Sequence, residues 1–234
     1  MAESPVPADF DNAPPMPISE YAQTVERVNV GYDLVFTLTG CLLRALNQPG
    51  LELLVVGAGG GAEIARFLPP NPDWRLTGVD PSREMLALAR TTVERLALED
   101  RVTLVQGTID DIPSDARFDA ATCLYVLHFL PDDDKLAVLR AIAARLRPGA
   151  PLLVASGALP DDGGLRDDLL GAWQQYGEQM GMPAERMAEI IAGLADRPWT
   201  PVGEFQRLLR DAGFTRIARY VEVLAGGQIA WIAR

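Results

Sequence analysis

The sequence predicts an α/β protein with a Rossmann-like, doubly wound, seven-stranded and mostly parallel sheet. Apolar runs of strand length alternate with amphipathic helical segments, which is the pattern of βαβ units. A glycine-rich turn, residues 57–61, directly follows the first apolar run. The next run ends beside Asp80, so we expect a ligand site at the carboxyl ends of the strands.

The N-terminal part is expected to form a helical cap on the sheet. Apolar residues recur at helical spacing over 19–47 and are interrupted near Gly31, which predicts two helices. Residues 1–18 are rich in proline, alanine and acidic residues, and we expect them to be a flexible lead. The remainder, 19–234, is predicted to be a single domain.

Five apolar runs are predicted to form the parallel part of the sheet; they cover 51–56, 74–79, 102–106, 118–124 and 151–156. The helix after the glycine turn must end before Pro69, because proline breaks a helix interior. The next helix is expected to begin at Pro81, a favourable first position. Asp132–Asp134 place negative charge at the start of a later helix, which suits its dipole and favours a solvated helix start over a metal site.

The alternation of strands and helices stops after the fifth strand. Residues 165–180 and 184–194 predict two helices within a helical insertion over 160–198. A further helix contains Phe205 and ends at Gly213. Two final runs, 217–224 and 228–232, predict an antiparallel hairpin with its turn at Gly226–Gly227. Such a hairpin is not typical of dehydrogenases.

Composition limits the partners and the compartment. A hydrophobic content of 48% and a charged content of 23% are ordinary for globular proteins, and no apolar run approaches the ~18 residues of a membrane span. The net charge of −11 disfavours direct nucleic-acid binding, because an acidic surface repels phosphates. Cys41 and Cys123 lack metal-ligand spacing and favour reduced thiols in a cytoplasmic protein.

The glycine turn and Asp80 together predict an adenosine-type cofactor. Gly57, Gly59 and Ala62 fit the G-x-G-x-x-G/A pattern, in which glycines adopt positive φ and let a ligand approach the backbone. An acid at the end of the following strand can accept hydrogen bonds from both ribose hydroxyls. The glycines alone would also suit an ordinary tight turn.

The chain resembles the class I S-adenosylmethionine-dependent methyltransferases. The resemblance is carried by LLVVGAGGG, LTGVDPSREMLALAR, VTLVQGTIDDI, FDAATCLYVLHFLPDDDK and RLRPGAPLLVAS. Within that superfamily, ERVNVGYDLV is similar to carboxy-S-adenosyl-L-methionine synthase and its small-molecule methyltransferase relatives. The resemblance implies S-adenosyl-L-methionine as cofactor and a homodimer. A dimer is also favoured by the apolar faces of the inserted helices.

The resemblance implies a role for each matching residue. Tyr32 would reach into the cofactor site, and Gly57, Ala58 and Gly59 would contact the methionine end. Asp80 would hold the ribose, with Pro81 and Met85 beside the adenine. Thr108 and Ile109 would border the adenine edge, and Leu124 would lie near the sulfonium.

Several positions depart from the family pattern. Val55 stands where an acid is usual, and Thr108 stands where aspartate is usual, although Asp110 and Asp111 follow it. Leu124 replaces a common polar residue. The synthase's carboxylate-binding arginine falls near Ile190, with Arg186 about one helical turn away. These departures leave three candidate functions open. The chain could be a methyltransferase with a small-molecule acceptor, a synthase-like enzyme that carboxylates the cofactor using prephenate, or a binding protein without catalysis.

His128 is the candidate catalytic residue. It is the only histidine and follows the fourth predicted strand, on the cofactor side of the sheet. An imidazole there could act as a general base for a hydroxyl or acid acceptor. The alternative is a structural histidine that is hydrogen-bonded to a loop. Tyr32 likewise either closes over the sulfonium with its ring face or packs between helices.

Overall fold

The computed structural model describes residues 10–12, 14, 17–157, 166–195, 200–223 and 228–234. It contains a seven-stranded sheet in the order β3-β2-β1-β4-β5-β7-β6. The strands are β1 (Glu52–Val56), β2 (Arg75–Asp80), β3 (Val102–Gln106), β4 (Ala120–Leu124), β5 (Leu152–Gly157), β6 (Ile217–Val223) and β7 (Gln228–Ala233). Only β7 runs antiparallel to its two neighbours, so the predicted fold class is confirmed.

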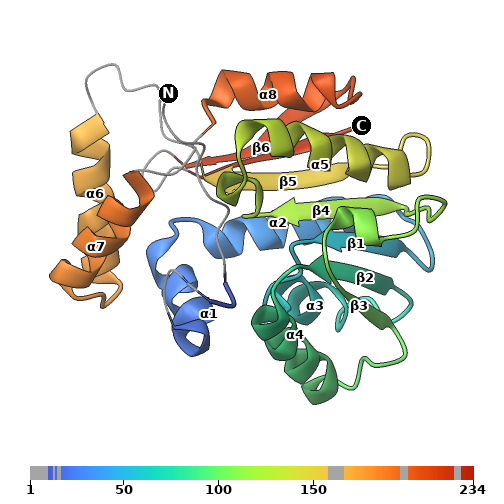
Figure 1. The fold of residues 1–234 in the computed structure, drawn as a ribbon, viewed down its shortest axis with the longest axis horizontal. Helices are drawn as coiled ribbons and strands as arrows, with labels where there is room; N and C mark the ends of the chain where they lie inside the picture. The colour runs from blue at the N-terminus through green and yellow to red at the C-terminus, as the bar shows by residue number, and fades with distance from the viewer. Residues whose placement is uncertain (1–9, 13, 15–16, 158–165, 196–199, 224–227) are drawn as a thin grey trace.

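Helices cover both faces of the sheet (Figure 1). They are α1 (Ile18–Val28), α2 (Tyr32–Arg44), α3 (Ala62–Phe67), α4 (Arg83–Arg95), α5 (Asp132–Arg145), α6 (Arg166–Gln179), α7 (Ala184–Ala195) and α8 (Val202–Asp211), with short 3₁₀ helices η1 (Ile109–Asp111) and η2 (Leu127–Phe129). Apolar residues of α2, α3 and α4 pack on one face, and those of α5 and α8 pack on the other. The layers are those expected of a doubly wound sheet.

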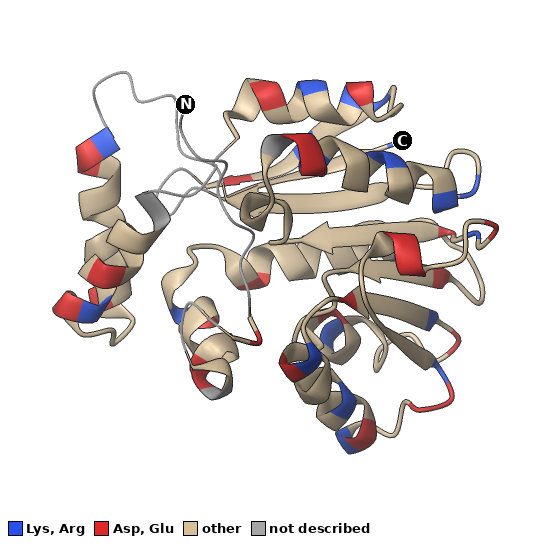
Figure 2. Cartoon of the chain, viewed as in Figure 1, with Lys and Arg blue, Asp and Glu red and all other residues tan. Residues whose placement is uncertain are grey.

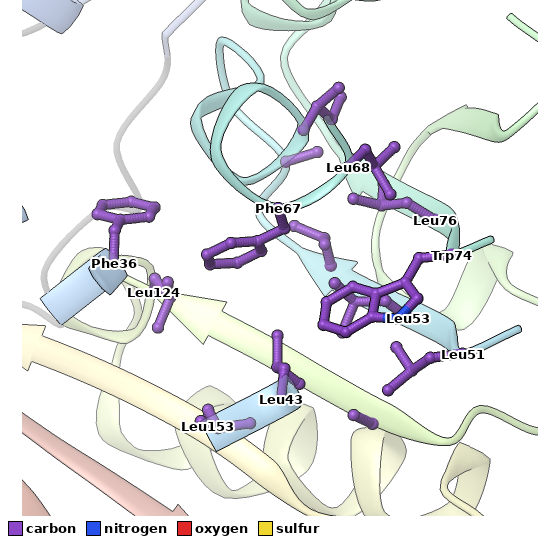
Figure 3. Packing of buried hydrophobic residues seen from close by; sticks show 14 of the residues in the cluster. Phe36, Leu43, Leu51, Leu53, Phe67, Leu68, Trp74, Leu76, Leu124 and Leu153 are labelled. Atoms are coloured by element: carbon purple, nitrogen blue, oxygen red, sulfur yellow. The ribbon is translucent and has the colours of Figure 1, made fainter. Parts of the chain in front are cut away.

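The core follows from the alternation of side chains along the strands. In β1, Leu53 and Val55 point into the cluster under α2 and α3, whereas Leu54 and Val56 point into the cluster under α5. All four are buried, as expected for a central parallel strand. Figure 3 shows the first cluster, in which Phe36 of α2 and Phe67 of α3 lie over strand residues such as Leu124.

The helices α6 and α7 form a pair beside the sheet, next to α1 (Figure 1). The indole Nε1–H of Trp173 donates a hydrogen bond of 2.6 Å to the carbonyl of Val28 at the end of α1. The Met187 side chain of α7 is fully buried and packs in one cluster with Trp173 and Val28. The inserted helices therefore pack against the N-terminal helical cap.

Element boundaries differ from the predictions in two places. Helix α4 begins at Arg83 and not at Pro81, because the Ser82 hydroxyl caps it by accepting the Met85 N–H at 3.1 Å. Strand β4 begins at Ala120, since Phe118 makes only an isolated bridge. The predicted hairpin turn at 226–227, most of the lead, and residues 160–165 and 196–198 of the insertion lie outside the described residues.

Charged residues occur mostly in the helices and loops, and the strands carry few of them (Figure 2). Within the described part of the chain, no helix combines the length and the apolarity needed to cross a membrane.

Candidate functional site

A cavity of about 210 Å³ lies at the carboxyl ends of β1, β2 and β4. The strand order reverses between β1 and β4, so the cavity occupies the topological switch point where doubly wound sheets bind ligands. Eight of the predicted cofactor-binding residues line it: Tyr32, Gly57, Ala58, Gly59, Asp80, Pro81, Met85 and Leu124. The sequence therefore pointed to eight of the residues that line this cavity.

The glycine loop is held in a conformation that side chains would disturb. Gly57 and Gly59 have φ values of +77° and +50°. The N–H groups of Gly57 and Ala58 both donate to the carbonyl of Val79 at 2.9 and 3.0 Å, which ties the loop to β2. A Cβ on Gly57 would lie 2.1 Å from the side chain of Val126. Glycine is required here for both conformation and space.

Asp80 joins the ends of β1 and β2. One carboxylate oxygen accepts the Gly59 N–H at 2.8 Å, and the other accepts the Ser82 N–H at 2.9 Å. Burial raises the pKa of Asp80, although both backbone hydrogen bonds oppose this shift. A carboxylate has about four acceptor positions, so each oxygen retains one for a ligand hydroxyl.

Part of the predicted lead covers the cavity. The Asp11 carboxylate accepts hydrogen bonds from the Ser82 hydroxyl at 2.6 Å and from the N–H groups of Arg83 and Glu84, both at 3.1 Å. Phe10 lines the cavity and packs edge-on against Phe129, with ring centroids 5.2 Å apart. The cavity is smaller than the ~300–1,000 Å³ typical of ligand sites, and Phe10 forms part of its wall.

Two tyrosines, Tyr32 and Tyr125, also line the cavity. The rings of Tyr32 and Tyr125 stack with centroids 5.3 Å apart and an interplanar angle of 20°. Tyr125 has a φ of +62°, which is unusual for a residue with a side chain. Its hydroxyl donates to the Gln228 side-chain oxygen of β7 at 2.6 Å. Burial raises the pKa of both phenols, so both remain neutral.

Glu63, in the first turn of α3, is a buried acid in the cavity wall. Its Oε1 atom has no hydrogen-bond partner among the described residues. Burial raises the pKa of this carboxyl to about 8, and the nearby charge of Asp80 adds to the shift. At neutral pH the side chain is therefore mostly a neutral acid.

Two residues taken from the family pattern do not line the cavity. Thr108 is exposed and caps η1, where its N–H donates to Asp111 at 2.8 Å. Ile109 is buried in the apolar cluster under α5. The family pattern expects an acid at position 108, and in this chain the acid lies three residues later and holds the turn itself.

His128 also lies outside the cavity wall. It is buried in η2, and its Nδ1 accepts a hydrogen bond of 3.4 Å from the Gly157 N–H at the end of β5. Its ring contacts Phe129, which does line the cavity. Arg186 likewise does not line the cavity, and it pairs with Glu189 on α7 at 2.8 Å.

The sequence reasoning missed several residues of the cavity wall, notably Phe10, Glu63 and Tyr125. Tyr125 could have been identified from the sequence, because it directly follows the fourth predicted strand and so lies at a carboxyl strand end. Glu63 follows the glycine turn immediately and is flanked by apolar helix residues. Nothing in the composition of the lead indicated that Phe10 would reach the site.

Comparisons with known proteins agree with this geometry. A family model described as a methyltransferase domain matches residues 54–152, from β1 to β5. Carboxy-S-adenosyl-L-methionine synthase of Chromohalobacter salexigens is 27% identical over 210 residues, which cover 87% of this chain and 76% of that protein. The 27-O-demethylrifamycin SV methyltransferase of Amycolatopsis mediterranei is 30% identical over 71% of this chain. This chain spans only 54% of that relative, about half its length.

The fold has close counterparts among solved structures. Magnesium protoporphyrin IX methyltransferase of Synechocystis PCC 6803, solved with bound SAM, superposes with a TM-score of 0.66 at 16% identity. The superposition covers 96% of this chain and 93% of that one. The matching methyltransferase domain model, the curated relatives and the shared fold all support a class I S-adenosylmethionine-dependent methyltransferase.

Proposed function

We propose that this chain is an S-adenosyl-L-methionine-dependent methyltransferase that acts on a small-molecule acceptor. The observation that carries the proposal is the meeting of the glycine loop and Asp80 in one cavity at the switch point of the sheet. The residues fit the cofactor, because Gly59 leaves the backbone accessible from the cavity and Asp80 retains acceptor positions.

Each part of the cavity wall would hold one part of the cofactor. The loop Gly57–Gly59 would contact the amino-acid end, and Asp80 would accept hydrogen bonds from the ribose hydroxyls. Met85 and Leu124 supply apolar surface, and the ring of Tyr32 attracts a cation. When bound, S-adenosylmethionine supplies a methyl group on a positively charged sulfur. The chain itself holds the two reactants together and excludes water.

The remaining wall suits an acceptor with an apolar body. It includes Phe10, Tyr21, Val25, Phe129 and Leu130. Relatives named as O-methyltransferases, including the erythromycin 3''-O-methyltransferase of Saccharopolyspora erythraea at 28% identity, support a hydroxyl as the methylated group.

Calorimetry with S-adenosylmethionine and S-adenosylhomocysteine tests the first half of the proposal. The second half is tested by incubating the protein with methyl-labelled cofactor and a panel of phenols and hydroxylated macrolides. Transfer of label to a panel member supports a methyltransferase. Binding without transfer to any acceptor supports the non-catalytic alternative, and the absence of binding to either cofactor form contradicts the proposal.

The second candidate is a carboxy-S-adenosyl-L-methionine synthase-like enzyme. It is favoured by the alignment with that synthase over 87% of the chain. Arg186, which would bind the added carboxylate, is paired with Glu189 and lies away from the cavity wall. Incubation with S-adenosylmethionine and prephenate, followed by mass spectrometry for a carboxylated cofactor, decides between the two activities.

A further inference from the structure

Glu63 is a buried acid in the cavity wall. Its side chain is 4% exposed, and Oε1 makes no hydrogen bond to any described residue. Leaving a buried polar atom unpaired is costly, and such atoms are rare in folded proteins. The strand beneath α3 does not compensate it, because Leu53 and Val55 of β1 present apolar side chains to this face.

The charges of the wall favour a cationic ligand. Of the described residues that line the cavity, only Glu63 and Asp80 are charged, and none is basic. Asp80 is already compensated by the N–H groups of Gly59 and Ser82. The basic residue on the same helix, Arg66, turns outward to Glu26 and Asp33. The backbone at Glu63 and the charge of Arg66 offset the burial of Glu63 only in part, so Glu63 is the acid left to bind a cation.

The geometry points to Glu63 as the residue that binds the α-ammonium group of the cofactor's methionine moiety. This assignment rests on the proposed function. Glu63 follows the glycine loop on α3, and the loop faces the amino-acid end of the cofactor. The stacked rings of Tyr32 and Tyr125 lie close enough to feel the charge of Glu63, and aromatic faces also attract an ammonium.

The ammonium suits this acid better than the sulfonium does. The sulfonium loses its positive charge as the methyl group leaves, so a carboxylate beside it would stabilise the reactant more than the transition state. The ammonium keeps its charge throughout the reaction and offers three donors. A carboxylate at the ammonium therefore strengthens binding without opposing the chemical step.

Binding of a cation should draw the proton away from Glu63. The carboxyl is mostly neutral when the cavity holds no cation, because its pKa is raised to about 8. An ammonium in contact with the side chain favours the ionised form. The titratable groups that face Glu63 from neighbouring elements are Tyr32 of α2, Arg66 of α3, Asp80 of β2, Cys123 of β4 and Tyr125 after β4. Burial keeps the phenols and the thiol neutral, so Glu63 is the group expected to release a proton.

The test compares three ligands with three charge-removing variants. S-adenosylmethionine carries both cations, S-adenosylhomocysteine carries only the ammonium, and 5′-methylthioadenosine carries neither. Glu63→Gln is expected to weaken the first two ligands by at least about tenfold and to leave the third unchanged. Asp80→Asn should weaken all three, since each contains the ribose. Glu94→Gln, on the exposed face of α4, is the matched control for the loss of one charge.

Proton release gives a second readout that a purely structural role would not change. Calorimetry at about pH 6.5, where the α-amino group is protonated, is performed in two buffers of different ionisation enthalpy. The unchanged protein should release about one proton on binding S-adenosylhomocysteine, and Glu63→Gln should release none.

The outcomes separate this assignment from the proposed function. If the unchanged protein binds none of the three ligands, the proposed function fails, and this assignment fails with it. If it binds them and Glu63→Gln binds S-adenosylhomocysteine equally well, only the assignment fails. A loss restricted to S-adenosylmethionine would move Glu63 to the sulfonium, and an equal loss for 5′-methylthioadenosine would show a distorted cavity. Either result overturns the ammonium assignment.

Discussion

The Asp80 carboxylate accepts the backbone N–H of Gly59 at a distance of 2.8 Å. This hydrogen bond links the end of β2 to the turn after β1, so the acid proposed to hold the ribose also fixes the loop proposed to contact the amino-acid end of the cofactor. The two sequence features that suggested a cofactor are thus one connected unit in the structure.

Asp80→Ala is expected to weaken binding of S-adenosylhomocysteine by about 1.5–3 kcal/mol, the range for hydrogen bonds to a charged group. Calorimetry on the folded variant measures the change. Because the variant also frees the Gly59 N–H, Asp80→Asn serves as a control that keeps an acceptor for it. An unchanged dissociation constant for Asp80→Ala would remove Asp80 from the cofactor site.

Gly59→Val is expected to abolish cofactor binding while the fold persists. A branched side chain resists the φ of +50° and would project into the cavity, near the methyl group of Met85. Gly149→Val is the matched control, since Gly149 also has a positive φ but lies in open space. The control should lose a similar amount of stability and keep its affinity. Normal titration by Gly59→Val would show that the loop is only a turn.

The strands, the glycine loop and Asp80 could be predicted because their signals are local. An apolar run, a glycine cluster and an acid at the next strand end lie within about 30 residues, the length of one βαβ unit. Their backbone conformations follow from the residue types, as the positive φ of Gly57 and Gly59 shows.

The remaining wall could not be predicted because its contacts are long-range. Asp11 meets Ser82 across 71 positions, and nothing near Asp11 in the sequence indicates a helix cap there. Glu63 has the pattern of an ordinary acid in the first turn of a helix, and only the packing of α3 shows that it is buried. Thr108 was assigned from the family pattern, and the local capping of η1 uses it differently.

Glu63 should make the unliganded protein less stable as the pH rises. Its pKa is about 4.3 in an unfolded chain and about 8 in the folded protein. Between these values the folded state binds more protons, so the free energy of unfolding falls with pH, by at most about 1.4 kcal/mol per pH unit.

Urea unfolding at a series of pH values between about 5 and 8 measures this dependence. Burial raises the pKa of Asp80 as well, which adds a decrease of the same sign. Glu63→Gln should remove the larger part of the slope and be the more stable protein at the upper end. Parallel curves for the two proteins would contradict the raised pKa of Glu63.

His128→Ala distinguishes the two roles of this residue. A general base would make turnover fall by roughly 10²–10⁴ at unchanged cofactor affinity. The hydrogen bond from Gly157 engages Nδ1, so we expect instead a loss of about 1–3 kcal/mol in stability, the cost of an unpaired buried N–H.

His128→Asn provides the control, because its side-chain oxygen can accept the Gly157 N–H but cannot act as an imidazole base. Recovery of the melting temperature together with full activity per folded molecule identifies a structural histidine. Recovery of stability alone, with turnover still lost, identifies the base.

We expect the protein to form a dimer in solution. The α6–α7 pair stands beside the sheet, and Met180 at its edge is 46% exposed. Light scattering at micromolar concentration should give about twice the chain mass of 25.4 kDa. A mass near that of one chain would contradict the dimer.

The hydrogen bond from Tyr125 to Gln228 can form only after the ribosome has synthesised the C-terminal hairpin. The two residues are 103 positions apart, so the ribosome needs roughly 5–20 s to proceed from one to the other. During that interval the nascent chain can already contain the glycine loop and Asp80, but the tyrosine wall lacks its anchor on β7. A ligand that binds only the completed cavity would therefore stabilise the finished sheet, in which β7 has paired with β5, over its unfinished precursor.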